Sequence, residues 1–176
     1  MTIFNTPRLQ VQKVKKNDVS FFMELLSAPE IIDPVPQAPM TEEEMKAMFE
    51  DSVLSDGSIF DKDRVIWGIY EGDKTELIGL CGVLTNDEGQ REVAYRLRKK
   101  YWGVGYGTEV TKYLIDYCFD ELKLETLAAD ANIENMGSVK ILEKYFTAVR
   151  DFFNEKENCT DRRFILKKED WTARFI

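Results

Sequence analysis

A glycine-rich segment in the second half of the chain places the strongest constraint on its fold. Residues Tyr101–Glu109 carry three glycines at alternate positions. Before them, residues 92–98 alternate between apolar and polar side chains, which predicts a strand; after them, apolar residues recur at helical spacing over 110–118. The sequence therefore predicts a strand, a glycine loop and a helix in direct succession. Such a unit binds anions, because glycine allows close backbone approach and the first N–H groups of the helix lack partners.

The natural ligand of this loop is a phosphate or pyrophosphate group, but two common nucleotide motifs do not account for it. The Rossmann fingerprint requires Gly-x-Gly-x-x-Gly, whereas Gly107 comes one residue early. The P-loop requires a Gly-Lys-Ser/Thr ending that this segment lacks. A tight turn before a helix is the alternative explanation of the glycines. The basic run Arg96–Lys100 lies just before the loop and favours the anion site.

Composition excludes several classes of protein and of catalytic site. With 176 residues, the chain is expected to form one domain over residues 1–176. It has no histidine, so Ser-His-Asp and Cys-His catalysis and most catalytic metal sites are excluded. Its net charge of -8 argues against a nucleic-acid partner and favours a cationic one. No apolar run approaches the length of a membrane span, and no signal peptide is apparent. The three cysteines are far apart, so we expect a cytoplasmic protein with reduced thiols.

Patterns elsewhere predict helices and strands in an order typical of an α/β domain. Thr41 and Glu44 form a capping box, which marks the start of a helix. Asn17 or Asp18 is placed to cap an earlier helix that ends near Ala28. Further strands are predicted at Leu9–Val14, Arg64–Tyr70, Glu76–Leu84, Ala148–Asn154 and Arg162–Lys168. Helices placed between antiparallel strand pairs imply a mixed sheet.

Two motifs, in the correct order along the chain, resemble the GNAT N-acetyltransferases. Residues Lys100–Gly105 are similar to the family's acetyl-CoA pyrophosphate loop, Arg/Gln-x-x-Gly-x-Gly/Ala, with lysine in the first place. Residues Asn132–Lys144 resemble its Asn-x-x-Ser helix start, and the opening Thr6–Leu9 fits the branch of ribosomal-protein N-terminal acetyltransferases. The resemblance implies a single-domain α/β GNAT-like fold, with a mixed, mostly antiparallel central sheet of about six to seven strands flanked by about four helices.

The same resemblance implies which residues bind acetyl-CoA and which catalyse the transfer. Glu92 is the candidate general base, and Ser138 the candidate hydrogen-bond donor or acid near the thiolate. The alternative for Glu92 is an ordinary charge at a strand edge, and the alternative for Ser138 is a residue that serves only in the first turn of a helix. Many members carry a tyrosine acid where this chain has Leu142, and Tyr145, one turn further on, is a candidate substitute. The candidate acetyl-CoA-binding residues are Arg98, Lys100, Trp102, Gly103, Val104, Gly105, Tyr106, Gly107, Thr108, Asn135 and Ser138, and no metal is expected.

The expected activity is transfer of an acetyl group from acetyl-CoA to a primary amine. A protein N-terminal α-amino group is the favoured acceptor, because its ordinary pKa of about 8 makes the neutral form accessible. A polyamine or an aminoglycoside is the alternative acceptor. A non-catalytic acyl-CoA-binding or regulatory module is the alternative outside the enzyme class, and Leu142 supports it.

The acceptor side is expected near a proline-containing segment. Residues Ile31–Met40 either line the acceptor site or form a rigid surface connection. Glu30, Asp33 and Glu42–Glu44 lie close to that segment in sequence and are expected to guide a cationic amine. We expect no nucleic-acid or membrane partner, and a monomer or homodimer.

Overall fold

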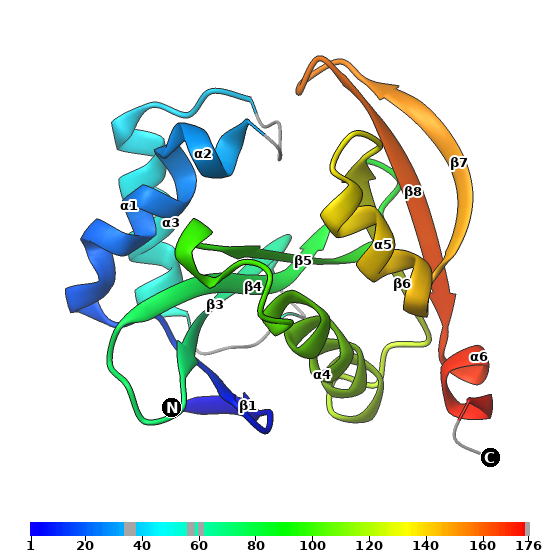
Figure 1. Ribbon diagram of the computed structural model, residues 1–176, viewed down its shortest axis with the longest axis horizontal. Helices are drawn as coiled ribbons and strands as arrows, with labels where there is room; N and C mark the ends of the chain where they lie inside the picture. Colours follow the sequence, from blue (N-terminus) through cyan, green and yellow to red (C-terminus); the bar gives the residue numbers. More distant parts are fainter. Residues whose placement is uncertain (34–37, 56–58, 60–61, 175–176) are drawn as a thin grey trace.

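A mixed sheet runs through the protein in the computed structural model, which describes residues 1–33, 38–55, 59 and 62–174 (Figure 1). Within these residues its eight strands lie in the order β1-β2-β3-β4-β5-β6-β8-β7. All neighbouring pairs are antiparallel except β5 and β6, which are parallel. The strands are β1 Thr2–Asn5, β2 Leu9–Gln12, β3 Arg64–Glu71, β4 Leu77–Thr85, β5 Arg91–Leu97, β6 Thr126–Asn132, β7 Thr147–Asn154 and β8 Cys159–Lys167. The predicted α/β fold is confirmed, with slightly more strands than expected.

The additional strand comes from the N-terminal end of the chain. The sequence predicts one strand over Leu9–Val14, whereas the structure has the hairpin β1–β2, with Thr2 opposite Gln12 and Asn5 opposite Gln10. Strand β1 has only four residues, Thr-Ile-Phe-Asn, and they do not alternate between apolar and polar. A short edge strand of this kind is held by backbone pairing with its neighbour, so its sequence carries little signal.

Four longer helices flank the sheet, as the sequence predicts, and two short ones accompany them among the described residues. The helices are α1 Val19–Ser27, α2 Pro29–Ile32, α3 Glu42–Leu54, α4 Tyr106–Asp120, α5 Met136–Tyr145 and α6 Lys168–Ala173, with 3₁₀ turns at Lys16–Asp18 and Lys99–Tyr101. The capping box of α3 is confirmed: Thr41 Oγ1 accepts a hydrogen bond from the Glu44 N–H at 3.2 Å, and the Thr41 N–H donates to Glu44 Oε2 at 2.7 Å. Pro29 begins α2, because proline fits the first helical position.

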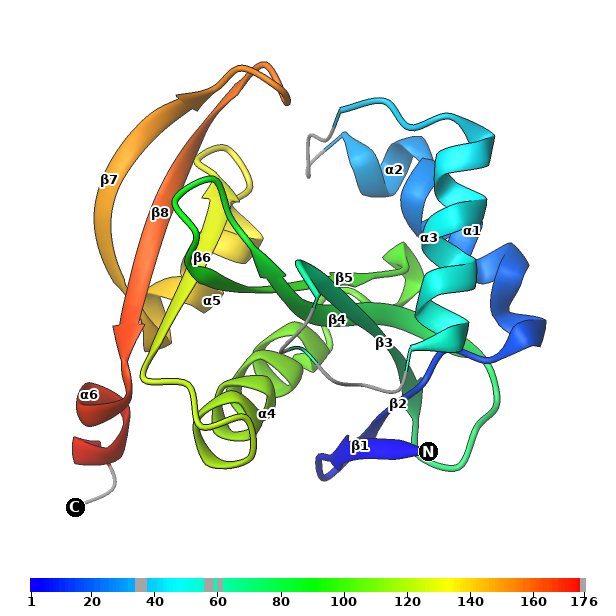
Figure 2. The same cartoon turned by 180° about the vertical axis from the view of Figure 1, so that it is seen from behind.

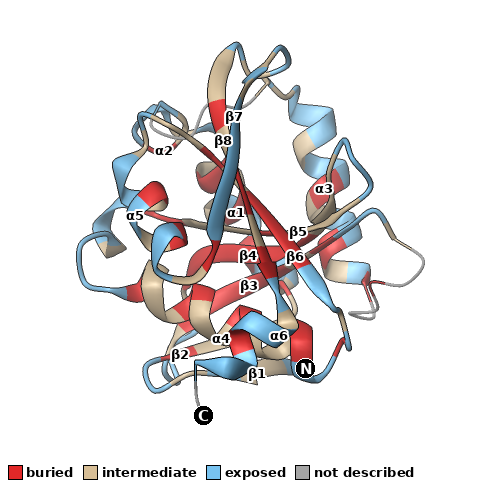
Figure 3. Cartoon of the chain, turned by 90° about the vertical axis from the view of Figure 1, so that its right-hand side faces the viewer, coloured by how far each residue is buried: buried red, intermediate tan, exposed pale blue. Residues whose placement is uncertain are grey.

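Hydrophobic side chains form a core on each face of the sheet. One core packs α4 and α5 against the sheet and includes the fully buried Val110 and Phe164. The other packs α1 and α3 and includes Phe22 and Leu25. Figure 2 shows α1 and α3 beside β3 and β4, and Figure 3 shows the inner strands buried and the outer strand β7 exposed. Burying one such side chain stabilises the fold by about 1.5–3 kcal/mol, so the two cores fix β4 and β5 in the middle of the molecule.

The sheet is split between its two parallel strands. The only residue pair that joins β5 to β6 within the described chain is Glu92 with Ala128, whereas seven pairs join β4 to β5. Figure 1 shows the two strands running apart from this junction, with α4 as the crossover between them. Backbone groups that face the gap therefore lack strand partners. The split opens the middle of the sheet to a ligand.

Candidate active site

The loop between β5 and α4 has the backbone conformation that an anion site requires. Gly103 and Gly105 have φ angles of +76° and +88°, in the region that favours glycine. The first intrahelical hydrogen bond of α4 runs from the Glu109 N–H to the Gly105 carbonyl at 3.0 Å. The N–H groups of Tyr106 to Thr108 consequently precede the helical ladder, at the positive end of the helix dipole. This arrangement fits a pyrophosphate group.

A cavity of about 420 Å³ lies in front of this loop, and we call it the loop cavity. It is bounded by β5, by the glycine loop and by the start of α5. The predicted coenzyme-binding residues that line it are Trp102, Gly103, Gly105, Tyr106, Gly107, Thr108, Asn135 and Ser138. Asn135 caps α5, because its Oδ1 accepts a hydrogen bond from the Ser138 N–H at 3.2 Å. The cap therefore holds the start of α5 at the wall of this cavity.

Three of the predicted coenzyme-binding residues do not line the loop cavity. Arg98 is 10% exposed and its guanidinium pairs with Glu24 at 2.9 Å and Glu76 at 2.5 Å. Lys100 Nζ lies 2.6 Å from the same Glu76. Val104 is 51% exposed. The two cations are therefore already paired with carboxylates that do not line the loop cavity.

A cation that the sequence analysis does not single out lies closer to the loop. The Arg8 Nη1 donates to the Val104 carbonyl at 2.9 Å, and its Nε pairs with Glu109 at 2.6 Å. Thr6 Oγ1 donates to the same glutamate at 2.5 Å. These contacts fasten the β1–β2 turn to the first turn of α4. The Thr-Pro-Arg-Leu segment was the available signal, but its partner is distant in sequence.

A second, larger cavity of about 730 Å³ lies on the other side of the split, and we call it the hairpin cavity. Its walls come from β4, β5 and β6 and from the turns of the β4–β5 and β7–β8 hairpins. The side chains that line both cavities are Tyr95, Arg96, Asn135 and Ser138. The two cavities therefore meet where β5 and β6 separate. A ligand in one cavity can therefore contact a ligand in the other at this junction.

Glu92 lies in the hairpin cavity, at the residue pair that joins the two halves of the sheet. Burial, together with the nearby charge of Asp130, raises the pKa of its carboxyl to about 8, although the charge of Arg163 acts to lower it. An acid with such a pKa exchanges protons near neutral pH. The predicted base is therefore placed beside the junction and electrostatically suited to accept a proton.

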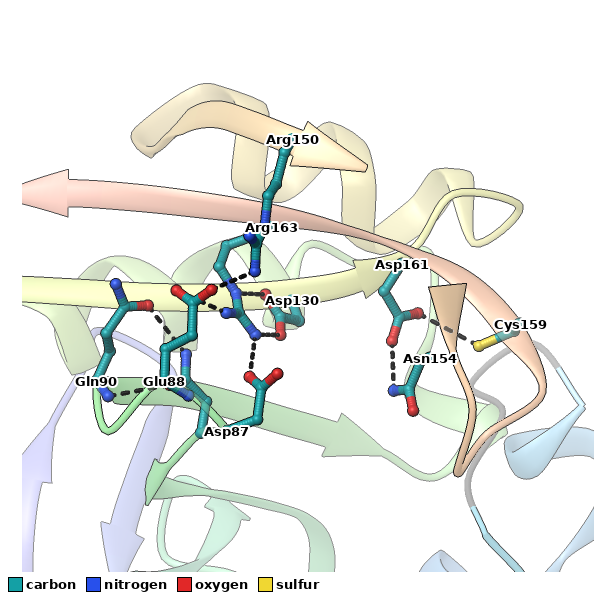
Figure 4. A network of polar contacts seen from close by, with 10 residues as sticks. Asp87, Glu88, Gln90, Asp130, Arg150, Asn154, Cys159, Asp161 and Arg163 are labelled. Carbon is teal, nitrogen blue, oxygen red and sulfur yellow. Dashed lines mark hydrogen bonds and ion pairs between the residues drawn. The ribbon is translucent and has the colours of Figure 1, made fainter. Parts of the chain in front are cut away.

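Arg163, which the sequence analysis does not single out, lowers the pKa of Glu92 and organises a network of charges. Figure 4 shows this arginine with Asp87, Glu88 and Asp130. Arg163 is 2% exposed, and its guanidinium makes two hydrogen bonds to Asp130, at 2.7 and 2.9 Å. It also pairs with Asp87 at 2.7 Å and Glu88 at 3.0 Å. These partners come from β6 and from the β4–β5 turn. No local pattern in the sequence could bring them together.

The first turn of α5 carries Ser138, and the hydroxyl of Tyr95 is its neighbour. Burial raises the pKa of Tyr95, and a hydrogen bond with the Ser138 side chain partly offsets this effect. Leu142, at the position of the family's tyrosine acid, is buried in the core. Tyr145 packs on Trp171, with ring centroids 5.6 Å apart, and lines neither cavity.

The acidic groups that line the hairpin cavity differ from those expected near the proline-containing segment. They are Asp87, Glu92, Asp130, Glu155, Glu157 and Asp161. Glu30 and Glu42–Glu44 do not line it, and Glu42 pairs with Lys46 at 2.6 Å. From the segment Ile31–Met40, Ile31 lines the loop cavity and Met40 the hairpin cavity. Residues 34–37, which include two of its prolines, lie outside the described residues.

Comparisons with known proteins identify the family to which the chain belongs. The family model described as "Acetyltransferase (GNAT) domain" matches residues 8–145. An uncharacterized N-acetyltransferase p20 of Bacillus licheniformis is 28% identical over 145 residues, which cover 81% of this chain and 80% of the relative. No helix among the described residues has the length and apolarity needed to span a membrane.

Solved structures share the fold. A GNAT-family acetyltransferase from Bacillus anthracis has a TM-score of 0.78 at 19% identity, over 96% of this chain and 99% of that one. The spermidine N-acetyltransferase from Vibrio cholerae, in complex with CoA and spermine, has a TM-score of 0.75 at 18% identity, over 93% and 98% of the two chains. The matched family model spans most of the sequence, so this chain is an acyltransferase that belongs to the GNAT acetyltransferase family.

Proposed function

We propose that the protein transfers the acetyl group of acetyl-CoA to a primary amine, with the coenzyme in the loop cavity and the amine in the hairpin cavity. The observation that carries this proposal is the meeting of the two cavities at the split, beside Glu92. The glycine loop and the start of α4 hold the pyrophosphate. The thioester then reaches the junction, where Asn135 and Ser138 line both cavities.

Glu92 acts as the general base in this proposal. An amine attacks a thioester only when it is neutral, so a group near the nitrogen must accept its proton. A carboxylate with a pKa of about 8 is well matched to an α-amino group, whose ordinary pKa is also about 8. A lysine side chain, with an ordinary pKa of about 10.4, matches less well. The match favours a protein N-terminal α-amino group as the acceptor, as in the ribosomal-protein N-terminal acetyltransferase branch.

The charge of the hairpin cavity supports a second candidate acceptor, a polyamine. Glu157 lines this cavity, and its buried Oε2 has no hydrogen-bond partner among the described residues. Burial and the charge of Asp161 raise the pKa of Glu157. A second cationic group on the acceptor would provide the missing partner. The similarity of fold to a spermidine N-acetyltransferase is consistent with this acceptor but does not select it.

Thiol release from acetyl-CoA tests the proposal. The acceptors are a short peptide with a free α-amine, the same peptide with that amine blocked and a free lysine side chain, spermidine, and an aminoglycoside. We expect the free peptide to release thiol and the blocked peptide to release little. Faster release with spermidine would establish the second candidate. Calorimetric binding of acetyl-CoA without thiol release from any acceptor would instead identify a non-catalytic coenzyme-binding module.

A further inference from the structure

The structure leaves the departing thiolate without the acid that the fold's usual pattern would supply. The Leu142 side chain has no acidic proton, and the residue is 4% exposed. Tyr145 lies at the far end of α5 from Ser138, against Trp171. A thiolate is a poorer leaving group than a thiol, because the developing negative charge must be stabilised. A replacement must therefore place an acidic group at the junction of the two cavities. Ser138 lies there, but its alcohol hydroxyl is a far weaker acid than a tyrosine hydroxyl.

All seven tyrosines lie within the described residues, and their contacts single out one of them. Tyr101 and Tyr106 line the loop cavity, but their hydroxyls donate to Glu76 at 2.9 Å and Glu71 at 2.7 Å. Tyr70 donates to Asp18 at 2.5 Å. The tyrosines that line neither cavity are Tyr70, Tyr113, Tyr117 and Tyr145. Tyr95 alone among the seven lines both cavities.

We propose that Tyr95 is the acid that protonates the departing thiolate, in place of the tyrosine that α5 lacks. This inference rests on the proposed acetyl transfer. The ring of Tyr95 packs against the first turn of α4: a Cβ atom at Gly107 would lie 3.1 Å from its Cε2 and 3.4 Å from its hydroxyl oxygen. Glycine at this position therefore lets the hydroxyl lie beside the helix start and Ser138.

The position of Tyr95 on its strand separates the acid from the base. Successive side chains of a strand point to opposite faces. Glu92 and Tyr95 are three residues apart on β5, so they point to opposite faces of the strand. Glu92 lines only the hairpin cavity, whereas Tyr95 packs against the core under α4 and α5. The amine proton and the thiolate proton are thus handled on opposite sides of the reacting carbonyl carbon.

The protons and electrons of the transfer balance with these two groups. The amine nitrogen forms a bond to the carbonyl carbon and loses a proton to the Glu92 carboxylate. The C–S bond breaks, its electron pair stays on sulfur, and the sulfur takes the proton of the Tyr95 hydroxyl. The tyrosinate regains a proton from water through the Ser138 hydroxyl, and the Glu92 carboxyl releases its proton to the hydroxide that remains, so both groups are restored. Burial raises the pKa of Tyr95, so its hydroxyl carries its proton at neutral pH.

Tyr95→Phe tests the inference, because it removes the hydroxyl and keeps the ring. With acetyl-CoA we expect kcat to fall on the order of 100-fold, with little change in the coenzyme's affinity measured by calorimetry. A purely structural role of the hydroxyl would lower turnover equally with every donor. Donors with different leaving groups therefore distinguish the role as an acid from a structural one. S-acetyl-N-acetylcysteamine releases an alkyl thiol, whereas phenyl thioacetate releases a more acidic aryl thiol that needs no acid. We expect the variant to lose its turnover with the first donor and to stay within about threefold of wild type with the second.

Tyr145→Phe is the matched control, because it makes the same chemical change outside both cavities. It should leave kcat with acetyl-CoA within about twofold of wild type. Equal losses by Tyr95→Phe with the alkyl and aryl donors, or no loss with either, would overturn the role of Tyr95. If wild type itself releases no thiol with any amine, the proposed function fails. If wild type is active and Tyr95→Phe is equally active, only the role of Tyr95 fails, so the two failures can be told apart.

Discussion

Replacing Glu92 by glutamine is expected to slow the enzyme and, at alkaline pH, to stabilise its fold. The carboxyl has an ordinary pKa of 4.5, and in the folded protein its pKa is about 8. Between these two values the folded state keeps a proton that the unfolded state has released. The unfolded state therefore binds fewer protons, and the free energy of unfolding falls as the pH rises through this window.

The size of the effect follows from that pKa difference. Because ionised Glu92 is buried, the free energy of unfolding of wild type should fall by roughly 4 kcal/mol between pH 5 and pH 9. This value is an upper limit, since water can enter the cavity around the carboxylate. Glutamine has nearly the same shape and does not titrate. Glu92→Gln should thus be about 2–4 kcal/mol more stable than wild type at pH 9, and the two should differ much less at pH 5.

Urea unfolding of both proteins at pH 5, 7 and 9 measures the stability difference. In parallel, kcat/KM of wild type should rise with pH through about 8, since the base must lose its proton before it can act. The variant should lose about two to four powers of ten in kcat. The acceptor amine titrates in both proteins, so the ratio of their profiles isolates the carboxyl. A stability difference independent of pH, together with unchanged kcat, would refute both the burial and the role as base.

Three other changes have definite expected outcomes. Gly105→Val forces a side chain into a φ of +88° and should weaken acetyl-CoA binding at least about tenfold in calorimetry, whereas Gly72→Val, also at positive φ but outside both cavities, should not. Arg163→Met removes the ion pair of the half-buried Asp130 carboxylate, so it should cost about 3 kcal/mol in urea unfolding. It should also move the rise of kcat/KM to higher pH, and an unmoved rise would contradict the electrostatic coupling. Glu157→Gln should raise the KM of a cationic acceptor and weaken its dependence on salt, while Glu43→Gln, outside the hairpin cavity, should change neither.

Features that depend on neighbouring residues could be predicted from the sequence. The strand, glycine loop and helix around Gly103 and Gly105 follow from local spacing, and so does the capping box at Thr41. Arg98 shows the limit of this reasoning. It lies close to the loop in sequence, but its guanidinium contacts Glu24 on α1, and neither residue lines the loop cavity. Proximity along the chain does not determine the direction of a side chain.

Features that depend on distant residues could not be predicted. The high pKa of Glu92 arises from burial and from Asp130 on β6, and Arg163 on β8 opposes it. Arg8 meets the glycine loop only because β1 and β2 fold beside α4. The sequence does not distinguish Tyr95, for a different reason. An aromatic residue in an alternating strand is usually a core residue, and only the shape of the two cavities distinguishes this one.

The single residue pair that joins β5 to β6 has a consequence for how proteins of this architecture can diverge. The proposed donor side is lined mainly by residues 95–108 and the start of α5, whereas the proposed acceptor side also draws on hairpin turns from other parts of the sequence. Mutations in those turns can therefore alter the accepted amine while the coenzyme contacts stay intact. After a gene duplication, one copy is free to explore new acceptors without first losing its donor. Selection then acts on the two specificities separately, which favours families with one shared donor and many different acceptors.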